Sequence, residues 1–194
     1  MCIRDRIVNE RTLAIIISQS GETLDTMAAL REAKSLGARI LSIVNVVGSS
    51  IARESDDVLY TWAGPEIAVA TTKAYSTQMA VLDLLAVYLA AQRKTISAEE
   101  AGRLTAAIAA LPAQVEQILS SREQIQYYAS QYFNHDSVFF IGRNLDYALG
   151  MEGSLKLKEI SYIHSEAYAS GELKHGTISL IEPGTLVIAL GTYG

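Results

Sequence analysis

The chain has 194 residues, of which 49% are hydrophobic and 19% are charged, and its formal net charge is −5 at pH 7. This length and composition allow a buried core in one domain or in two small ones. The negative charge argues against a general nucleic-acid or anionic-membrane surface, so no nucleic-acid or membrane partner is expected. The apolar stretch 80–91 contains Asp83 and is shorter than the roughly 20 residues that cross a bilayer, which predicts a core helix.

Cys2 is the only cysteine, so neither an internal disulfide nor a cysteine-based metal site is expected. Segment 1–6 has no apolar signal-peptide core, and the cysteine usage is consistent with a cytoplasmic protein. The same segment fits no local structural rule and is expected to be foreign to the domain. His135, His164 and His175 have no spacing suited to metal ligands. We therefore expect no metal and no cofactor.

Strand and helix patterns alternate through the first half of the chain. The run Ile15-Ile16-Ile17 is apolar on both faces, which is typical of a strand covered on both sides. Gly37 stands just after a predicted helix, where glycine is favoured. Strands are predicted at 13–18, 39–45 and 57–61, and helices at 23–36, 50–55 and 72–93. This order predicts an α/β fold with a parallel sheet flanked by helices.

From 97 to 132 the strand signal disappears. Ser97 and Glu100 have the spacing of a capping box, and Pro112 is expected to separate two helices. We interpret 96–130 as a helical linker between a first unit at 1–95 and a second unit at 131–194. Within the second unit, the sequence predicts a strand at 137–142, a helix at 146–164 and a strand at 185–190.

A weak internal repeat relates the two units. The segments TLAIIISQSG (12–21) and TLVIALGTYG (185–194) share four of ten residues. A short strand could reach this level by chance. If the repeat is real, the chain ends where the helix of the second copy should begin, and it is then a fragment.

The end of the first predicted strand carries a hydroxyl-rich turn. Ser18, Gln19, Ser20 and Gly21 are followed by a helix that begins at about Thr23. A helix N-terminus presents unpaired N–H groups and a partial positive charge, so this turn suits an anion such as phosphate. Gly21 would let the backbone approach the ligand closely. The alternative is that Ser20 or Thr23 simply caps the helix.

A second group of ionisable residues lies in the second unit. Glu152, Lys156 and Glu159 share one face of a predicted helix, where Lys156 could tune the Glu159 carboxylate and help to bind an anionic substrate. The alternative is a solvated salt-bridge face. His175 could act as a general acid or base, or it could be a loop histidine without a role. His164 is expected near the helix end, with a structural role.

Several segments together resemble the sugar isomerase (SIS) domain family. The loop SQSGET (18–23) is similar to the phosphate loop of that family. The segments KLKEISYIH (156–164) and GELKHG (171–176) resemble the isomerase portion of the glutamine:fructose-6-phosphate aminotransferase (isomerizing) family, as do NVVGSS (45–50), RESD (53–56) and AGPEIAVATTKAY (63–75). The similarity runs from about Leu13 to Leu190. It implies a three-layer SIS fold in two tandem units, both truncated.

The resemblance also implies a reaction and a substrate. The family converts fructose 6-phosphate to glucosamine 6-phosphate, using ammonia that a separate domain releases from glutamine. A phosphorylated hexose is therefore the expected ligand. By this similarity Ser18, Gln19, Ser20 and Thr23 would hold its phosphate, and the backbone of Val69 would contact the sugar.

The same resemblance implies three catalytic roles. Glu159 would move the proton between C1 and C2, because enolisation needs a carboxylate base beside the carbon acid. Lys156 would support the proton transfers. His175 would assist ring opening and would reach the site of a neighbouring subunit, so a homodimer is expected for the longer parent protein.

The chain departs from the family pattern at both ends. Cys2 matches the position of the glutaminase nucleophile, but 3–6 lacks the glycine-containing strand, and we interpret the match as a coincidence. The first strand and loop of the SIS unit and the C-terminal tail are absent, so the isolated chain is expected to bind weakly and to turn over nothing. The alternatives are a non-catalytic SIS sugar-phosphate-binding module and a SIS phosphosugar isomerase or deglycase that acts without glutamine.

Overall fold

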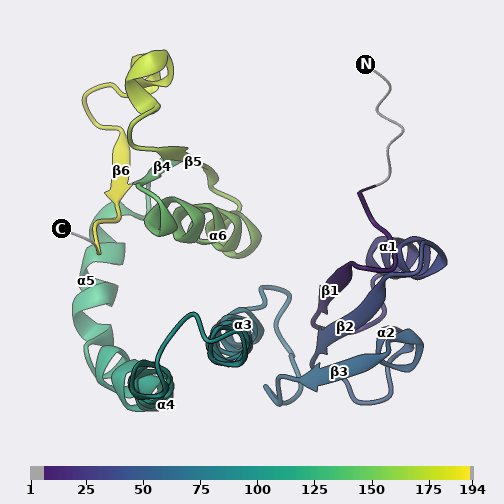
Figure 1. The fold of residues 1–194 in the computed structure, drawn as a ribbon. Coiled ribbons are helices and arrows are strands. Elements are labelled where there is room, and N and C mark those ends of the chain that lie inside the picture. Colours follow the sequence, from purple (N-terminus) through teal and green to yellow (C-terminus); the bar gives the residue numbers. More distant parts are fainter. Residues whose placement is uncertain (1–6, 193–194) are drawn as a thin grey trace. The chain divides into compact units, whose positions relative to one another are not determined.

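The structure is a computed structural model that describes residues 7–192. The chain divides into two compact units, one containing residues 7–67 and 71–111 and the other 68–70 and 112–192. Each unit contains one three-stranded sheet (Figure 1), and every strand pair in both sheets is parallel. The predictions for Cys2 and the rest of 1–6 fall outside the described residues.

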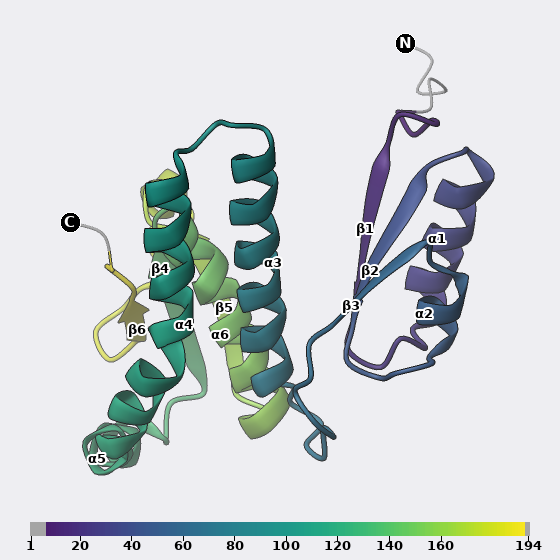
Figure 2. The ribbon, with the colours of Figure 1, turned by 60° about the horizontal axis from the view of Figure 1, so that its bottom comes forward.

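The first sheet has the order β1-β2-β3, in which β1 is Leu13–Ser18, β2 is Arg39–Val44 and β3 is Asp57–Tyr60. Helices α1 (Leu24–Ser35) and α2 (Ser50–Glu54) lie on the same face of this sheet (Figure 2). All five elements agree with the predicted bounds to within one residue at each end, so the predicted order of strands and helices is confirmed here.

The core of the first unit lies between this sheet and its two helices. Leu30 of α1, Ile40 of β2 and Ile51 of α2 are fully buried. The central strand β2 is buried from Ile40 to Val44. On the edge strand β1, by contrast, Leu13, Ile15 and Ile17 are 44%, 40% and 39% exposed. The prediction that β1 is covered on both sides is therefore wrong for the described chain, because α1 covers one face only.

Helix α3 (Lys73–Gln92) matches its predicted bounds but is not a core helix, since Ala74 is its only buried residue. Leu41 and Leu59 of the sheet, together with Val81 and Leu85 of α3, line an apolar cavity of about 380 Å³. By length and composition alone, the 20-residue helix α3 is long and apolar enough to cross a membrane. One such helix is weak evidence for a membrane span.

Two further helices follow, α4 (Ala98–Ser120) and α5 (Arg122–Tyr132). Glu100 N–H donates to Ser97 Oγ at 3.1 Å, which is one half of the predicted capping box. The predicted break at Pro112 is wrong, because α4 continues through this residue. Neither helix has a buried residue, so water can satisfy the carbonyl that proline leaves without a donor. The break falls at Ser121, whose hydroxyl and N–H both donate to the Ile118 carbonyl oxygen.

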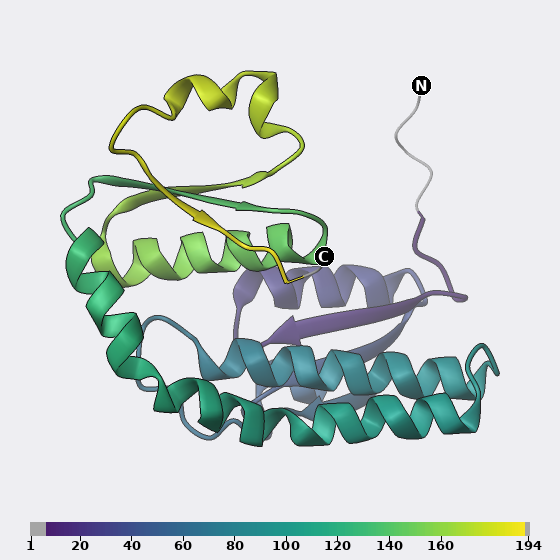
Figure 3. The same ribbon diagram turned by 90° about the vertical axis from the view of Figure 1, so that its left-hand side faces the viewer.

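The second sheet has the order β5-β4-β6. Its strands are β4 (Ser137–Gly142), β5 (His164–Ala169) and β6 (Leu186–Ala189), and α6 (Leu145–Ser161) runs along β4 and β5 (Figure 3). Two short 3-10 helices, Leu173–His175 and Thr177–Leu180, precede β6.

The sequence prediction missed β5 and extended the preceding helix too far. Helix α6 ends at Ser161, and Tyr162 takes a left-handed backbone conformation with φ +62°. His164 therefore begins a strand and does not lie at the end of a helix. The segment His164–Ala169 contains few large apolar residues, so its pattern carried little strand signal.

Candidate functional site

The candidate phosphate loop, residues 18–23, lies at the carboxyl edge of the first sheet. Because β1 and β2 are parallel, the segments that follow Ser18 and Val44 are neighbours. Asn45 N–H donates to the Gln19 carbonyl oxygen at 3.1 Å, which joins the two segments directly. Ligands of open α/β sheets bind at this edge of the strands.

The hydroxyl groups of the phosphate loop are close together. Ser18 Oγ lies 3.1 Å from Thr23 Oγ1 and accepts the Gly21 N–H at 3.0 Å. Ser20 Oγ accepts the Glu22 N–H at 3.2 Å. Ser18 is buried, whereas Gln19 and Ser20 are partly exposed and Thr23 is exposed. The sequence therefore places a buried hydroxyl beneath groups that solvent can reach.

Helix α1 begins without a side-chain cap. Thr23 occupies the N-cap position, but its hydroxyl makes no capping hydrogen bond and pairs with Ser18. The alternative that Thr23 caps α1 is therefore wrong, and the hydroxyl of Ser20 binds within the turn. The first N–H groups of α1 thus lack a side-chain partner at the N-cap, which is the arrangement that favours an anionic ligand.

Gly21 is required by the geometry of the phosphate loop. Its φ is +69°, and a Cβ atom at this position would lie 2.0 Å from Ser49 Oγ. Ser49 precedes α2 and is 3% exposed. The backbone of the loop therefore packs directly against the start of α2, and only glycine fits there.

The acid–base candidates Lys156, Glu159 and Glu152 meet on α6. Lys156 Nζ lies 2.6 Å from Glu159 Oε2 and 3.7 Å from Glu152 Oε1. The side chains of Lys156, Glu159 and Glu152 are 19%, 30% and 22% exposed, so the two ion pairs are partly shielded from solvent. The hydrogen bond to Glu159, reinforced by the charge of Glu152, raises the pKa of Lys156. Lys156 is thus a cation at neutral pH, suited to stabilise negative charge beside a carboxylate.

The structure also describes His175 and Val69, the other two predicted site residues. His175 is exposed in the first 3-10 helix, where its N–H donates to the Glu172 carbonyl oxygen at 2.9 Å. Val69 is 92% exposed in the segment between β3 and α3. Their predicted roles stay predictions. His164 Nδ1 lies 3.2 Å from Ser137 Oγ, which joins the starts of β5 and β4.

Two residues that sequence reasoning did not single out have clear roles in the structure. Glu22 Oε1 accepts the Ser50 N–H at 2.8 Å. Asp146, which is 4% exposed, accepts the N–H and the hydroxyl of Thr192 at 3.0 and 2.5 Å. Both contacts join residues at least 28 positions apart, so no local pattern could reveal them. Among residues 7–192, no group of three or more His, Cys, Asp or Glu could hold a metal ion.

Comparison with known proteins defines the class of this protein. The sequence profile of the SIS domain family matches residues 5–88 and 131–194. The chain belongs to the SIS domain family, and the match of one profile to both segments supports two tandem units.

Individual relatives indicate the type of protein more specifically than the family profile does. The chain is 58% identical over 189 residues to a glutamine–fructose-6-phosphate aminotransferase (isomerizing) of Clostridium acetobutylicum and 60% identical over 189 residues to that of Caldanaerobacter subterraneus subsp. tengcongensis. Each match covers 97% of this chain and 31% of the relative, so the chain spans about a third of their length. Among solved structures, the C-terminal domain of glucosamine-fructose-6-phosphate aminotransferase from Francisella tularensis is 39% identical, with a TM-score of 0.92 over 96% of this chain and 53% of that one.

Proposed function

We propose that this chain is the isomerase part of a cytoplasmic glutamine:fructose-6-phosphate aminotransferase, which makes glucosamine 6-phosphate from fructose 6-phosphate and glutamine-derived ammonia. The observation that carries the proposal is the identity of 58–60% with relatives of that name across nearly the whole chain. The activity belongs to the longer protein, because the chain corresponds to 31% of those relatives.

In this proposal the phosphate loop anchors the substrate. The hydroxyls of Ser18, Ser20 and Thr23, with Gln19 and the first N–H groups of α1, hold the sugar phosphate. The uncapped start of α1 and the mutual proximity of the hydroxyls support this role. The backbone of Val69 contacts the sugar. The phosphate is remote from the reacting carbons, so its binding restricts the orientation of the sugar.

The acid–base chemistry is assigned to the second unit. Glu159 takes the proton from one carbon and returns it to the neighbouring one, moving it between C1 and C2. Lys156, held 2.6 Å from Glu159, supplies positive charge beside the developing enediolate. His175 assists ring opening, and in a homodimer it would act in the site of the neighbouring subunit. The exposure of His175 is compatible with that assignment.

The test uses the full-length parent with fructose 6-phosphate and glutamine. Glu159→Gln is expected to lower turnover by about 10²–10⁴-fold, the usual range for a general base, while phosphosugar affinity stays unchanged. Ser20→Ala/Thr23→Ala should lose affinity for phosphosugars. Glu99→Gln, an exposed carboxylate in the first turn of α4, is the matched control.

Three results would contradict the proposal. Full turnover by Glu159→Gln would exclude this residue as the base. Isomerisation or deamination without any use of glutamine would indicate another SIS isomerase or deglycase. Phosphosugar binding with no turnover of any kind would indicate a binding module.

A further inference from the structure

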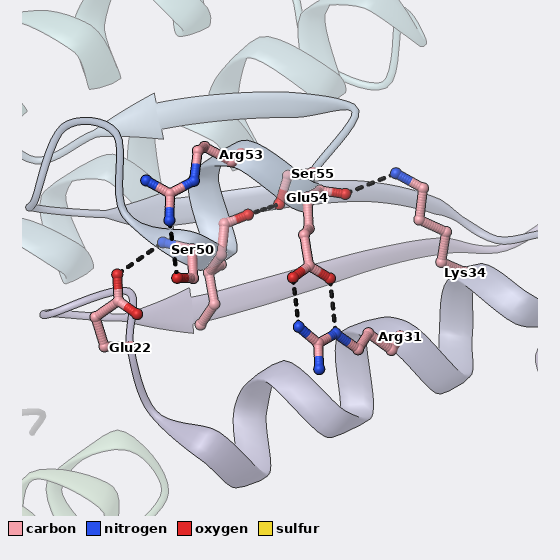
Figure 4. Close-up of polar contacts among 8 residues, drawn as sticks. Glu22, Arg31, Lys34, Ser50, Arg53, Glu54 and Ser55 are labelled. Atoms are coloured by element: carbon pink, nitrogen blue, oxygen red, sulfur yellow. Dashed lines mark hydrogen bonds and ion pairs between the residues drawn. The ribbon is translucent and has the colours of Figure 1, made fainter.

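The phosphate loop is tied to α2 at two successive residues. The Gly21 carbonyl oxygen accepts the Ile51 N–H at 3.0 Å, and Glu22 Oε1 accepts the Ser50 N–H at 2.8 Å. Figure 4 shows the Glu22 carboxylate turned toward Ser50. We infer that Glu22 is a positioning residue, which fixes the phosphate loop by binding α2 and does not itself touch the substrate. This inference rests on the proposed role of the loop.

Helix α2 also makes hydrogen bonds to α1, so Glu22 binds an element that α1 contacts as well. At the far end of α2, Arg31 donates two hydrogen bonds to the Glu54 carboxylate at 2.8 and 2.6 Å. Lys34 Nζ donates to the Glu54 carbonyl oxygen at 2.6 Å (Figure 4). The phosphate loop leads into α1 and also contacts the start of α2, while α1 contacts the end of α2. These three segments therefore form a ring, in which each one contacts the next. Releasing Glu22 removes one of the two contacts that hold the loop to α2, at the end that carries the hydroxyls, and leaves the Gly21–Ile51 hydrogen bond.

The charge of Glu22 distinguishes positioning from direct binding. Its hydrogen bonds to Ser50, chiefly to the backbone N–H, lower the pKa of Glu22, so the group is ionised at neutral pH. A carboxylate two residues from Ser20 repels a phosphate, so any benefit of Glu22 to phosphate binding is expected to come from its contact with α2. Glutamine at this position keeps an oxygen that can accept the Ser50 N–H and removes the repulsion.

The contact between Glu22 and Ser50 can also be broken by removing its donor, the Ser50 N–H. Ser50 is the first residue of α2, where proline is favoured in helices. Ser49 has φ −61° and ψ 163°, a conformation that a following proline accepts. Ser50→Pro therefore deletes the N–H while leaving α2 able to form. Ser50→Ala keeps the N–H and is the matched control.

The experiment measures affinity for glucosamine 6-phosphate by calorimetry on the full-length parent. We expect roughly tenfold weaker binding in Glu22→Ala and in Ser50→Pro, with no further loss when the two are combined. Glu22→Gln should bind at least as tightly as the wild type, even if its melting temperature is lower, and Ser50→Ala should stay within about twofold. A purely structural role would instead rank affinity and melting temperature in the same order.

A second readout needs no ligand. Amide hydrogen exchange at Gly21 to Thr23 should be faster in Glu22→Ala and Ser50→Pro than in the wild type, and unchanged in Ser50→Ala. Unchanged exchange in the first two variants, or Glu22→Gln binding as weakly as Glu22→Ala, would overturn the inference. Absence of phosphosugar binding by the wild type would overturn the proposed function, and the exchange rates would still decide the role of Glu22.

Discussion

Gly21→Ala is expected to destabilise the first unit by about 2–5 kcal/mol. The left-handed backbone, with φ +69°, costs a non-glycine residue about 1–2 kcal/mol. The new Cβ would lie 2.0 Å from Ser49 Oγ and 2.5 Å from Ser49 Cβ, far inside contact distance. Relieving such a clash in a packed region costs about 1–3 kcal/mol more.

Gly48 provides a matched control for the conformational part. Its φ is +71°, but a Cβ there meets nothing within 4 Å. Gly48→Ala should therefore cost only the conformational share, about 1–2 kcal/mol. The clash with Ser49 is absent when Ser49→Gly is combined with Gly21→Ala. Relative to Ser49→Gly alone, the double variant should therefore lose only the conformational part, about 1–2 kcal/mol.

The assay is urea unfolding followed by far-UV circular dichroism, with amide exchange of β2 as the measure of the first unit itself. Equal losses in Gly21→Ala and Gly48→Ala would refute the steric argument. So would a double variant that is no more stable than Gly21→Ala.

Three further predictions concern other parts of the chain. Leu30→Ala should destabilise the first unit by about 2–5 kcal/mol in urea unfolding, because Leu30 is fully buried, and a loss below about 1 kcal/mol would contradict its place in the core. Hydrogen bonding by the Ile40 N–H, at 2.8 Å, lowers the pKa of Asp56, so its stabilising contribution is present above the unfolded pKa of about 3.9 and is lost as pH falls through the folded value. Thermal melts should therefore fall less steeply below about pH 5 in Asp56→Asn than in the wild type, and parallel curves would count against this linkage. Asp146→Ala should lower the melting temperature of the second unit, because the Thr192 N–H and hydroxyl lose their acceptors, and an unchanged temperature would exclude that role.

Most strands and helices of the first unit could be predicted from the sequence, because each depends on residues that are close together in the chain. The run of isoleucines from Ile15 to Ile17, the stop at Gly37 and the spacing along α3 each depend on neighbouring residues. The same reasoning failed at Pro112, where solvent around an unburied helix tolerates the proline. It also failed at His164, since β5 is held by pairing with β4 and not by its own composition.

The candidate site shows the same division. The hydroxyl-rich turn from Ser18 to Thr23 and the shared face of Lys156 and Glu159 could be predicted from the sequence. The contact of Glu22 with Ser50 could not, because it depends on how α2 packs beside the turn. The burial of both faces of a strand could not be predicted either, since it depends on which helices cover the sheet.

Because the strands of the first sheet are parallel, the loops that follow its strands and the turns that precede them lie at opposite edges of the sheet. The turn between α1 and β2, around Gly37, lies at the amino edge, whereas residues 18–23 lie at the carboxyl edge. Gly37 has φ +86° and its N–H donates to the Lys34 carbonyl oxygen at 3.0 Å, which closes the end of α1 within the turn. A fluorescent label or a short peptide tag inserted there would sit a full strand length from the hydroxyls. We therefore expect a label or linker at the amino edge to leave the candidate phosphate loop undisturbed.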